Sequence, residues 1–422
     1  MGIDRQAKAN ALTEQLIQWR RSIHANPELS FQEYDTANVV AVALQRMGMT
    51  RVETGVGKTG VVGTLTSGEG PTIAIRADMD ALPILEKTDH DFRSKNEGIM
   101  HACGHDAHTA ILLGAASLLV DEFQSGTLQG TVKFIFQPAE ESTDENGVSG
   151  ASYMIQDGVL NGVDAILALH MCPWLPVGKV QVNDGPSMAS VDVFEGKLYG
   201  TGGHGAYPHL GTDPIWMLGP VLQALYGIVA RKVSALDSAV ISVGQINSGT
   251  ASNIIPTEVT IEGTVRSYKQ DVREFLVSEL ERVFALTRGL GGDYSFKIER
   301  GEPALHNDSV INKWLVQTIC DLYPTFQIVE EPFGLGGEDF GWMTERVPGA
   351  MFFLGCAIRD GIKRDLHTPI FDIDEACLPV GTAILAETVR RYLAGEVSFD
   401  AGSNPTELRS CFLDCDKSEK II

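Results

Sequence analysis

The chain lacks an excess of basic residues and lacks long apolar runs. Its 422 residues carry 33 Lys and Arg against 55 Asp and Glu, a formal net charge of −22. Nucleic acids and anionic membranes both require a basic face, so we expect neither as a partner. No apolar run approaches the ~20 residues of a membrane span, and Met1 to Arg21 has no signal-peptide apolar core. We therefore expect a cytoplasmic protein.

Cysteines are few and scattered, which argues against a disulfide scaffold. There are seven, an odd number, at wide spacings. Cys411 and Cys415, in the polar tail, either form a weak metal or disulfide pair or have no role. The others outside the motif described below are expected to be small core residues: Cys172, Cys320, Cys356 and Cys377.

The chain is too long for one ordinary core, so we expect about two domains. Short β-branched and apolar runs alternate with helical patterns in its first part, which indicates an α/β fold. We expect a mixed, mostly parallel sheet with helices on both faces. The strands are predicted at Val61–Leu65, Thr72–Arg76, Thr131–Gln137 and Ala165–His170.

The pattern changes near residue 188, where half-buried strands and two helices follow within about 110 residues. This is the size and order of an inserted α+β two-layer sandwich. After residue 302 the first pattern returns. We therefore expect a catalytic domain in two parts, 1–187 and 303–395, an inserted domain at 188–302, and a polar tail at 396–422.

Potential metal ligands are concentrated in Met100–Thr109, which contains three His, one Cys and one Asp before an apolar helix. Thiolate, imidazole and carboxylate are the ligands of zinc and related metals. Cys103 and His105 can reach one metal or a bridging pair from a tight loop, and the helix N-terminus would favour the thiolate. The alternative is a buried cysteine beside capping histidines. His101 and His108 orient ligands or pack in the core.

Further candidate residues follow strand ends or lie in late loops. Glu140 and Glu141 follow an apolar strand, and if extended they point in opposite directions, one toward a metal and one toward a water. The alternative is a solvated pair of charges. His170 and His367 are single histidines, which are usually structural. Gly336–Phe340 contains two acids before a short helix and could simply cap it.

Together these motifs resemble the dinuclear-metal amidohydrolases of the aminoacylase and carboxypeptidase G type. The resemblance is closest to the branch of hippurate hydrolase, indole-acetyl-amino-acid hydrolases and N-acetyl-diaminopimelate deacetylases. It spans most of residues 15–395, and its motifs occur in the family's order. They are Arg21–Phe31, Arg76–Pro83, Met100–Thr109, Gln137–Glu141, His204–His209, Ser248–Pro256, Gly337–Phe340 and His367–Pro369.

The resemblance implies two divalent metal ions, zinc or alternatively manganese, cobalt or nickel. The implied ligands are Cys103, His105, Glu141, His170 and His367. Glu140 matches the general base, and His204 and Asn253 match further catalytic residues. Asp78 and Asp106 would support the ligands, and Gly336, Gly337 and Arg266 would bind substrate. Other branches have His-x-Asp where this chain has Arg76-Ala77-Asp78, which changes the metal geometry.

The implied reaction is cleavage of N-acyl amino acids (N-acetyl, N-benzoyl or indole-acetyl) by a metal-activated water, with Glu140 as base then acid. The inserted domain would act as a lid and pair two copies in a homodimer. One alternative is a dipeptidase or carboxypeptidase that acts on free peptides. Another is a protein without activity whose metal is structural, but such a site would not need Glu140.

Overall fold

The computed structural model describes residues 4–399 of the chain. By their contacts these residues divide into two compact units. Unit 1 contains the described residues up to Gly185, then His306–Pro332 and the residues from Trp342 onward. Unit 2 contains Pro186–Leu305 and Phe333–Gly341. Cys411, Cys415 and the predicted tail from residue 400 lie outside the described residues.

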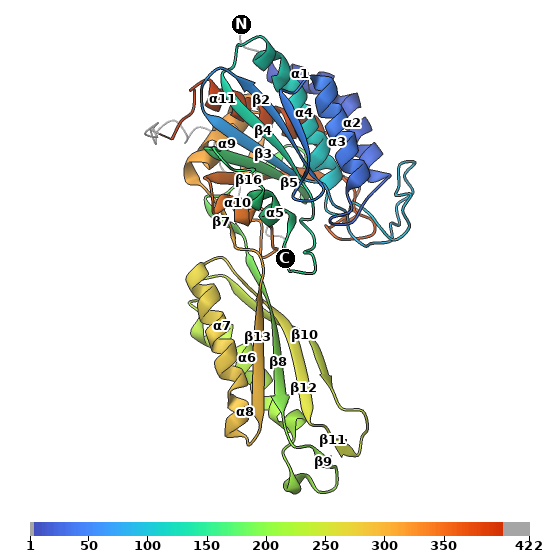
Figure 1. The fold of residues 1–422 in the computed structure, drawn as a ribbon, viewed down its shortest axis with the longest axis vertical. Coiled ribbons are helices and arrows are strands. Elements are labelled where there is room, and N and C mark those ends of the chain that lie inside the picture. The colour runs from blue at the N-terminus through green and yellow to red at the C-terminus, as the bar shows by residue number, and fades with distance from the viewer. Residues whose placement is uncertain (1–3, 400–422) are drawn as a thin grey trace. The chain divides into compact units, whose positions relative to one another are not determined.

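Unit 1 is built on an eight-stranded mixed sheet (Figure 1). Neighbouring strands β4, β3, β5 and β16 run parallel. Strands β1 and β2 pair antiparallel with their neighbours, and β6 is antiparallel to β16 but parallel to β15. The central strands are buried along nearly their whole length rather than alternately, so both faces of the sheet are covered. The predicted α/β sheet is confirmed. In sheet order the strands are β1 (Arg51–Val56), β2 (Gly60–Ser67), β4 (Gly130–Gln137), β3 (Thr72–Asp78), β5 (Ala165–Pro176), β16 (Gly349–Ala357), β6 (Lys179–Gln181) and β15 (Gln327–Val329).

Helix α4 (His105–Gln124) is the central helix of unit 1. It packs against α2, α3 and α11 as well as β3. Nearly every one of its residues is buried, and this explains why its sequence is apolar all round instead of amphipathic. No described helix combines the length and apolarity needed to cross a bilayer. The remaining helices outside unit 2 are α1 (Arg5–Ala11), α2 (Thr13–His24), α3 (Tyr34–Met47), α5 (Gly150–Gln156), α9 (Ser309–Leu322), α10 (Gly341–Thr344) and α11 (Cys377–Leu393).

Unit 2 is a four-stranded antiparallel sheet with its helices on one face (Figure 1). Burial alternates along β8 and β12, because only the face toward the helices is covered. The predicted two-layer α+β insertion is confirmed. Its elements are β8 (Ser190–Tyr199), β9 (Gly203–His204), η1 (Pro208–Leu210), α6 (Pro214–Lys232), β10 (Ala239–Ser248), β11 (Ile254–Ile255), β12 (Glu258–Ser267), α7 (Gln270–Phe284), α8 (Leu286–Gly289) and β13 (Asp293–Arg300), and a separate ladder pairs β7 (Gly185–Met188) with β14 (Leu305–Asn307).

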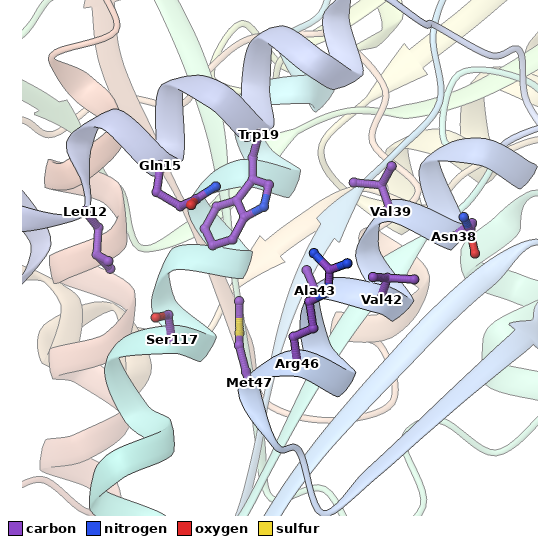
Figure 2. A pocket seen from close by; sticks show the side chains of 10 residues that line it. All are labelled: Leu12, Gln15, Trp19, Asn38, Val39, Val42, Ala43, Arg46, Met47 and Ser117. Atoms are coloured by element: carbon purple, nitrogen blue, oxygen red, sulfur yellow. The ribbon is translucent and has the colours of Figure 1, made fainter.

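A groove of about 590 Å³ runs between α2 and α3 (Figure 2). Trp19 lies on one wall, Val39 and Val42 lie on the other, and Ser117 of α4 contributes from below. Arg46 is the only charged residue of its lining, which contains no histidine, cysteine or carboxylate. This groove is therefore separate from the metal chemistry that the sequence predicts.

Candidate metal centre

The candidate ligands meet at one edge of the unit 1 sheet, although they come from distant parts of the sequence. Asp78 ends β3, Glu140 and Glu141 follow β4, and His170 lies within the neighbouring strand β5. The carboxyl ends of parallel strands lie at the same sheet edge, where open α/β sheets hold their ligands. Cys103 and His105 join them from the start of α4, and His367 from the loop that follows β16.

The five proposed ligands form two groups of three that share Cys103. In one group the ligand atoms of Cys103, His105 and His170 all lie within 4.8 Å of one another. In the other, those of Cys103, Glu141 and His367 meet the same limit. Cys103 Sγ lies 3.5 Å from His170 Nε2, and His367 Nε2 lies 3.3 Å from Glu141 Oε1. A sulfur shared by two ligand groups is the arrangement that a bridging thiolate needs.

His105 Nε2 has three carboxylates around it and no hydrogen-bond partner among the described residues. It lies 3.7 Å from Asp78 Oδ2, 3.8 Å from Glu141 Oε1 and 3.9 Å from Glu140 Oε2. These distances are too long for hydrogen bonds. A buried polar atom without a partner is costly, so this nitrogen and its carboxylates fit a bound cation.

The pKa of His105 also indicates that the surrounding carboxylates favour a positive charge at this position. Burial lowers it, but Asp78 and Asp80 outweigh burial and raise the pKa from 6.5 to about 10. The described protein therefore favours a proton on this ring. A divalent cation would satisfy the same carboxylates and leave the imidazole neutral, which is the form that binds metals.

Both glutamates approach the same ring nitrogen, and the expectation that they point in opposite directions if extended does not apply, because the chain bends at both residues. That expectation assumed an extended backbone. Ala139, the residue before Glu140, instead has a φ of +47°, which places it in the left-handed region. The chain turns sharply after β4, and Glu140 Oε2 and Glu141 Oε1 both come within 4 Å of His105 Nε2.

The Cys103 thiol also differs from expectation. We expected the helix N-terminus to favour the thiolate, but burial, followed by the charges of Glu141 and Glu140, raises the pKa of this thiol well above its usual value. Helix α4 begins at His105 with Gly104 as its N-cap, so Cys103 lies outside the helix. A dipole effect falls off within one turn, and here two nearby carboxylates outweigh it. The thiolate needs a nearby cation.

Hydrogen bonds to the backbone and to carboxylates orient the candidate ligands. The Nδ1–H of His170 donates to the Met171 carbonyl at 2.8 Å, so its Nε2 faces Cys103. Both nitrogens of His108 are engaged, since Nδ1 bonds Asp78 at 2.6 Å and Nε2 accepts from the Met171 N–H at 2.9 Å. His108 and Asp78 therefore support the site, as ligand-orienting groups usually do.

Asp106 lies in a buried ionic cluster behind the loop of Cys103. Its Oδ2 accepts from His24 Nδ1 at 2.8 Å and from Arg20 Nε at 3.2 Å. Arg20 also binds Asp372 and Glu375. Burial opposes ionisation of Asp106, but Arg20 and His24 overcome it and hold its pKa well below the usual range. This residue ties α4 to α2 and contacts no candidate ligand directly.

Asp80 is the supporting residue that the sequence analysis did not assign. Its carbonyl oxygen lies 2.9 Å from His105 Nδ1. Its Oδ2 accepts from the Glu141 N–H at 3.0 Å and from the Ser30 hydroxyl at 2.7 Å. A signal was present, because Asp78 and Asp80 are two residues apart just where β3 ends. We assigned a role only to the first of them.

The remaining predicted residues lie in unit 2. His204 ends β9 and is exposed, and its Nδ1 accepts from the Ala206 N–H at 3.0 Å. The carbonyl of Asn253 accepts from the Gly205 N–H at 2.9 Å, so His204 and Asn253 are neighbours. Arg266 donates to the Leu335 carbonyl at 2.9 Å, beside Gly336 and Gly337. The five predicted residues of this unit thus form two separate groups, His204 with Asn253 and Arg266 with the segment of Gly336 and Gly337.

Comparison with known proteins places the chain in a family. Residues 74–391 match peptidase family M20/M25/M40. An N-acetyl-L-cysteine deacetylase of Bacillus subtilis is 41% identical over 389 residues, which cover 91% of this chain and 89% of the relative. Thermostable carboxypeptidase 2 of Saccharolobus solfataricus is 40% identical over 372 residues, which cover 87% and 92%.

A solved structure agrees with the sequence matches. The dinuclear metal binding peptidase of the M20 family from Bacillus subtilis has a TM-score of 0.79 and 36% identity, and the match covers 91% of this chain and 99% of that one. The family match alone spans well over half of the chain. The chain therefore belongs to peptidase family M20/M25/M40 and is a hydrolase of amide bonds.

Proposed function

We propose that this hydrolase cleaves N-acyl amino acids, of the N-acetyl, N-benzoyl or indole-acetyl type, to a carboxylic acid and a free amino acid. The observation that carries the proposal is the pair of ligand groups sharing Cys103, with Glu140 beside the same buried His105 nitrogen. The name of the deacetylase relative describes this reaction on an N-acetyl amino acid.

Two divalent ions fit the donor set. Cys103, His105 and His170 would hold one, and Cys103, Glu141 and His367 would hold the other. A thiolate with imidazoles favours zinc, and manganese, cobalt and nickel are alternatives. When bound, such ions lower the pKa of a water molecule and polarise the amide carbonyl.

Glu140 is the proposed proton carrier. Its carboxylate takes a proton from the attacking water as the water oxygen bonds to the amide carbon. It then delivers that proton to the amide nitrogen as the C–N bond breaks, so the products are an acid and an amine. Glu140 Oε2 is 3.9 Å from His105 Nε2, so the carboxylate lies beside the proposed ligands, which supports its assignment as the base.

The residues proposed from unit 2 are assigned from the family resemblance. His204 and Asn253 would assist at the carbonyl oxygen as it gains charge. Arg266 with Gly336 and Gly337 would hold the substrate carboxylate. A guanidinium beside backbone N–H groups is a suitable receptor for that anion, and Arg266 already contacts the segment that contains these glycines.

A carboxypeptidase or dipeptidase is the alternative, because two relatives from Saccharolobus solfataricus carry the name carboxypeptidase. The two reactions share their chemistry. A peptide that loses its C-terminal residue is an N-acyl amino acid whose acyl group is itself a peptide. The difference lies in the size of the acyl group and in the ammonium that a free dipeptide carries.

A substrate panel on metal-reconstituted protein tests the proposal. We expect hydrolysis of acetyl-, benzoyl- or indole-acetyl-amino acids with higher kcat/KM than of dipeptides that end in the same amino acid. Faster cleavage of the free dipeptides would establish the peptidase instead. No turnover of either class by the fully metallated protein would exclude both.

We also propose a homodimer that forms through unit 2. Strand β10 is one of the two edge strands of the unit 2 sheet, so its outer N–H and C=O groups are available to another strand. Apolar side chains are exposed on the same unit, among them Trp216 and Ile254 at 59% and 56% exposure, and Ile246 of β10. An edge strand with exposed apolar residues favours pairing with a second copy.

A cytoplasmic location fits the cysteine chemistry. The proposed ligand Cys103 forms no disulfide among the described residues, and it must be reduced to bind metal. A reducing compartment would keep it so.

A further inference from the structure

The turn that carries Glu140 has a backbone conformation that needs external support. Ala139 is fully buried and has a φ of +47°, a region that residues other than glycine, asparagine and aspartate rarely adopt. Such a residue keeps this conformation only when its surroundings hold it. The groups that hold Ala139 therefore influence where the Glu140 side chain points.

Glu33 is one of these groups. Its carboxylate is completely buried, and Oε1 accepts hydrogen bonds from the Ala139 N–H at 2.8 Å and the Phe31 N–H at 2.9 Å. Its Oε2 accepts from the Thr59 hydroxyl. Among the described residues, no lysine, arginine or histidine forms an ion pair with it. Burial and then the charge of Asp80 raise the pKa of Glu33 to about 7, and the hydrogen bonds oppose this rise.

Capping of helix α3 does not account for Glu33. This residue occupies the N-cap position of α3, but its side chain makes no capping hydrogen bond there. The side chain of Glu28 caps the helix instead, because its carboxylate accepts from the Asp35 N–H at 3.0 Å and the Thr36 N–H at 2.9 Å. The Glu33 carboxylate is turned away from its own helix and toward the turn after β4.

The other backbone groups of the turn are fixed as well. The Ala139 carbonyl accepts from the Gly150 N–H at 2.9 Å, and the Glu141 N–H donates to Asp80 Oδ2 at 3.0 Å. Glu140 thus lies between peptide groups that are held on both sides. Removing the Glu33 carboxylate would leave the Ala139 N–H buried without a partner, which favours rotation of that peptide.

We propose that Glu33 is a positioning residue, whose carboxylate fixes the peptide that joins Pro138 to Ala139 and thereby holds the turn that aims the Glu140 side chain at the reacting water. The proposal rests on the proposed function, in which Glu140 is the general base. Glu33 contacts neither a candidate metal ligand nor a substrate group through its side chain. Its influence on the reaction passes through the backbone of Ala139.

The test compares Glu33→Leu, which removes both acceptors, with Glu33→Gln, which keeps a carbonyl oxygen for the two N–H groups. We expect Glu33→Leu to lower kcat by about 10²-fold, as misplacement of a catalytic group by about 1 Å can do. KM and the metal-to-protein ratio should stay unchanged. Glu33→Gln should restore kcat close to the wild-type value. Glu28→Leu is the matched control, expected to weaken α3 but to leave kcat unchanged.

Two further readouts separate positioning from a general structural role. Hydrogen exchange of the substrate-free protein should be faster in Glu33→Leu at the Ala139 amide and unchanged in the strands. In a Glu140→Gln background, Glu33→Leu should lower kcat little further, because it acts through a base that is already absent. If Glu33→Leu does not fold, Glu33→Asp takes its place, since its shorter side chain cannot reach the Ala139 N–H.

The proposal is overturned if Glu33→Leu has the wild-type kcat, or if it lowers kcat in the Glu140→Gln background as much as in the wild type. It is also overturned if hydrogen exchange at the Ala139 amide is unchanged in Glu33→Leu. It is also overturned if Glu33→Gln is as impaired as Glu33→Leu. Failure of the proposed function looks different, because it would show as an inactive wild-type protein or as an active Glu140→Gln variant. The exchange measurement needs no substrate and remains decisive in either case.

Discussion

Asp80 Oδ2 accepts a hydrogen bond of 3.0 Å from the backbone N–H of Glu141. The carbonyl oxygen of the same aspartate lies 2.9 Å from His105 Nδ1. One residue therefore orients a candidate ligand in each of the two groups that share Cys103. Such orienting contacts fix the position of a ligand before the metal arrives, which lowers the cost of forming the site.

Asp80→Ala should weaken metal binding about 10- to 100-fold, the range that is typical for loss of an orienting contact. The variant leaves the Glu141 N–H without its acceptor and frees the carboxylate to turn. Titration of the apo protein against a competing chelator measures the affinity. The exposed Asp89, replaced in the same way, is the control and should bind metal as the wild type does. Equal affinities of the two variants would contradict an orienting role for Asp80.

Glu140→Gln should lower kcat by about 10³-fold or more, because the amide cannot accept the proton of the water. The two side chains have the same shape, so the metal-to-protein ratio should stay that of the wild type. Steady-state kinetics together with elemental analysis distinguish the two effects. Retained activity would remove Glu140 from the mechanism, and loss of metal would make it a ligand.

Cys103→Ser should reduce the metal content, since a serine hydroxyl is a much weaker ligand than a thiolate. Both ligand groups contain Cys103, so both ions should be affected rather than one. Elemental analysis after dialysis against metal-containing buffer measures the ratio. The buried Cys356, which belongs to neither group, provides the control as Cys356→Ser. A Cys103→Ser protein with an unchanged ratio would refute the ligand role.

The α/β sheet could be predicted because its strands are local features of the sequence. The run Thr131–Gln137 was predicted as a strand, and β4 spans Gly130–Gln137. Burial on both faces makes such runs continuously apolar, which a single sequence shows directly. The five candidate ligands came from motif resemblance, because no local pattern states which distant histidine will meet Cys103.

The supporting contacts could not be predicted, since they depend on residues far apart in the chain. Glu33 and Ala139 are 106 positions apart, and nothing in either local sequence indicates that a carboxylate will bind that N–H. The left-handed conformation of Ala139 is equally hidden, because alanine has no preference for it. The raised pKa of Cys103 arises from burial and from Glu141 and Glu140, which only the folded chain brings near.

Gly150→Ala should disturb the turn of Glu140 from its other side. A Cβ at Gly150 would lie 1.7 Å from the Pro138 carbonyl oxygen, a distance that forces the backbone to move. We expect kcat to fall and the protein to lose about 1–3 kcal/mol of stability, as overpacking typically costs. Gly219→Ala is the control, because open space surrounds that helical position and the change should be neutral or stabilising. If both variants had the same kinetics and stability, the Pro138 carbonyl oxygen would not lie as close to Gly150 as the structure has it.

Unit 2 should determine the oligomeric state. Ile246→Lys places a charge on the exposed edge strand β10, and lysine at an edge opposes strand pairing. We expect the variant to halve the molar mass measured by light scattering after size exclusion. Leu236→Lys is the control, because Leu236 is 95% exposed and lies outside strand β10. The molar mass of this variant should stay that of the wild type. A wild-type mass for Ile246→Lys would contradict pairing through β10.

His24 should make stability depend on pH. Burial lowers its pKa, but hydrogen bonds to Asp106 and Glu86 outweigh burial and raise the pKa from 6.5 to about 9. Because the pKa of His24 is higher in the folded than in the unfolded protein, its proton stabilises the fold. This stabilisation is complete below pH 6.5 and is lost as the pH rises through about 9. A pKa shift of this size corresponds to about 3 kcal/mol of folding free energy. His24→Gln should therefore lower the urea midpoint at about pH 6 and have a much smaller effect above pH 9. The exposed His209, replaced by Gln, should show no such pH dependence. If the effect of His24→Gln were the same at both pH values, His24 would not carry a proton in the folded protein.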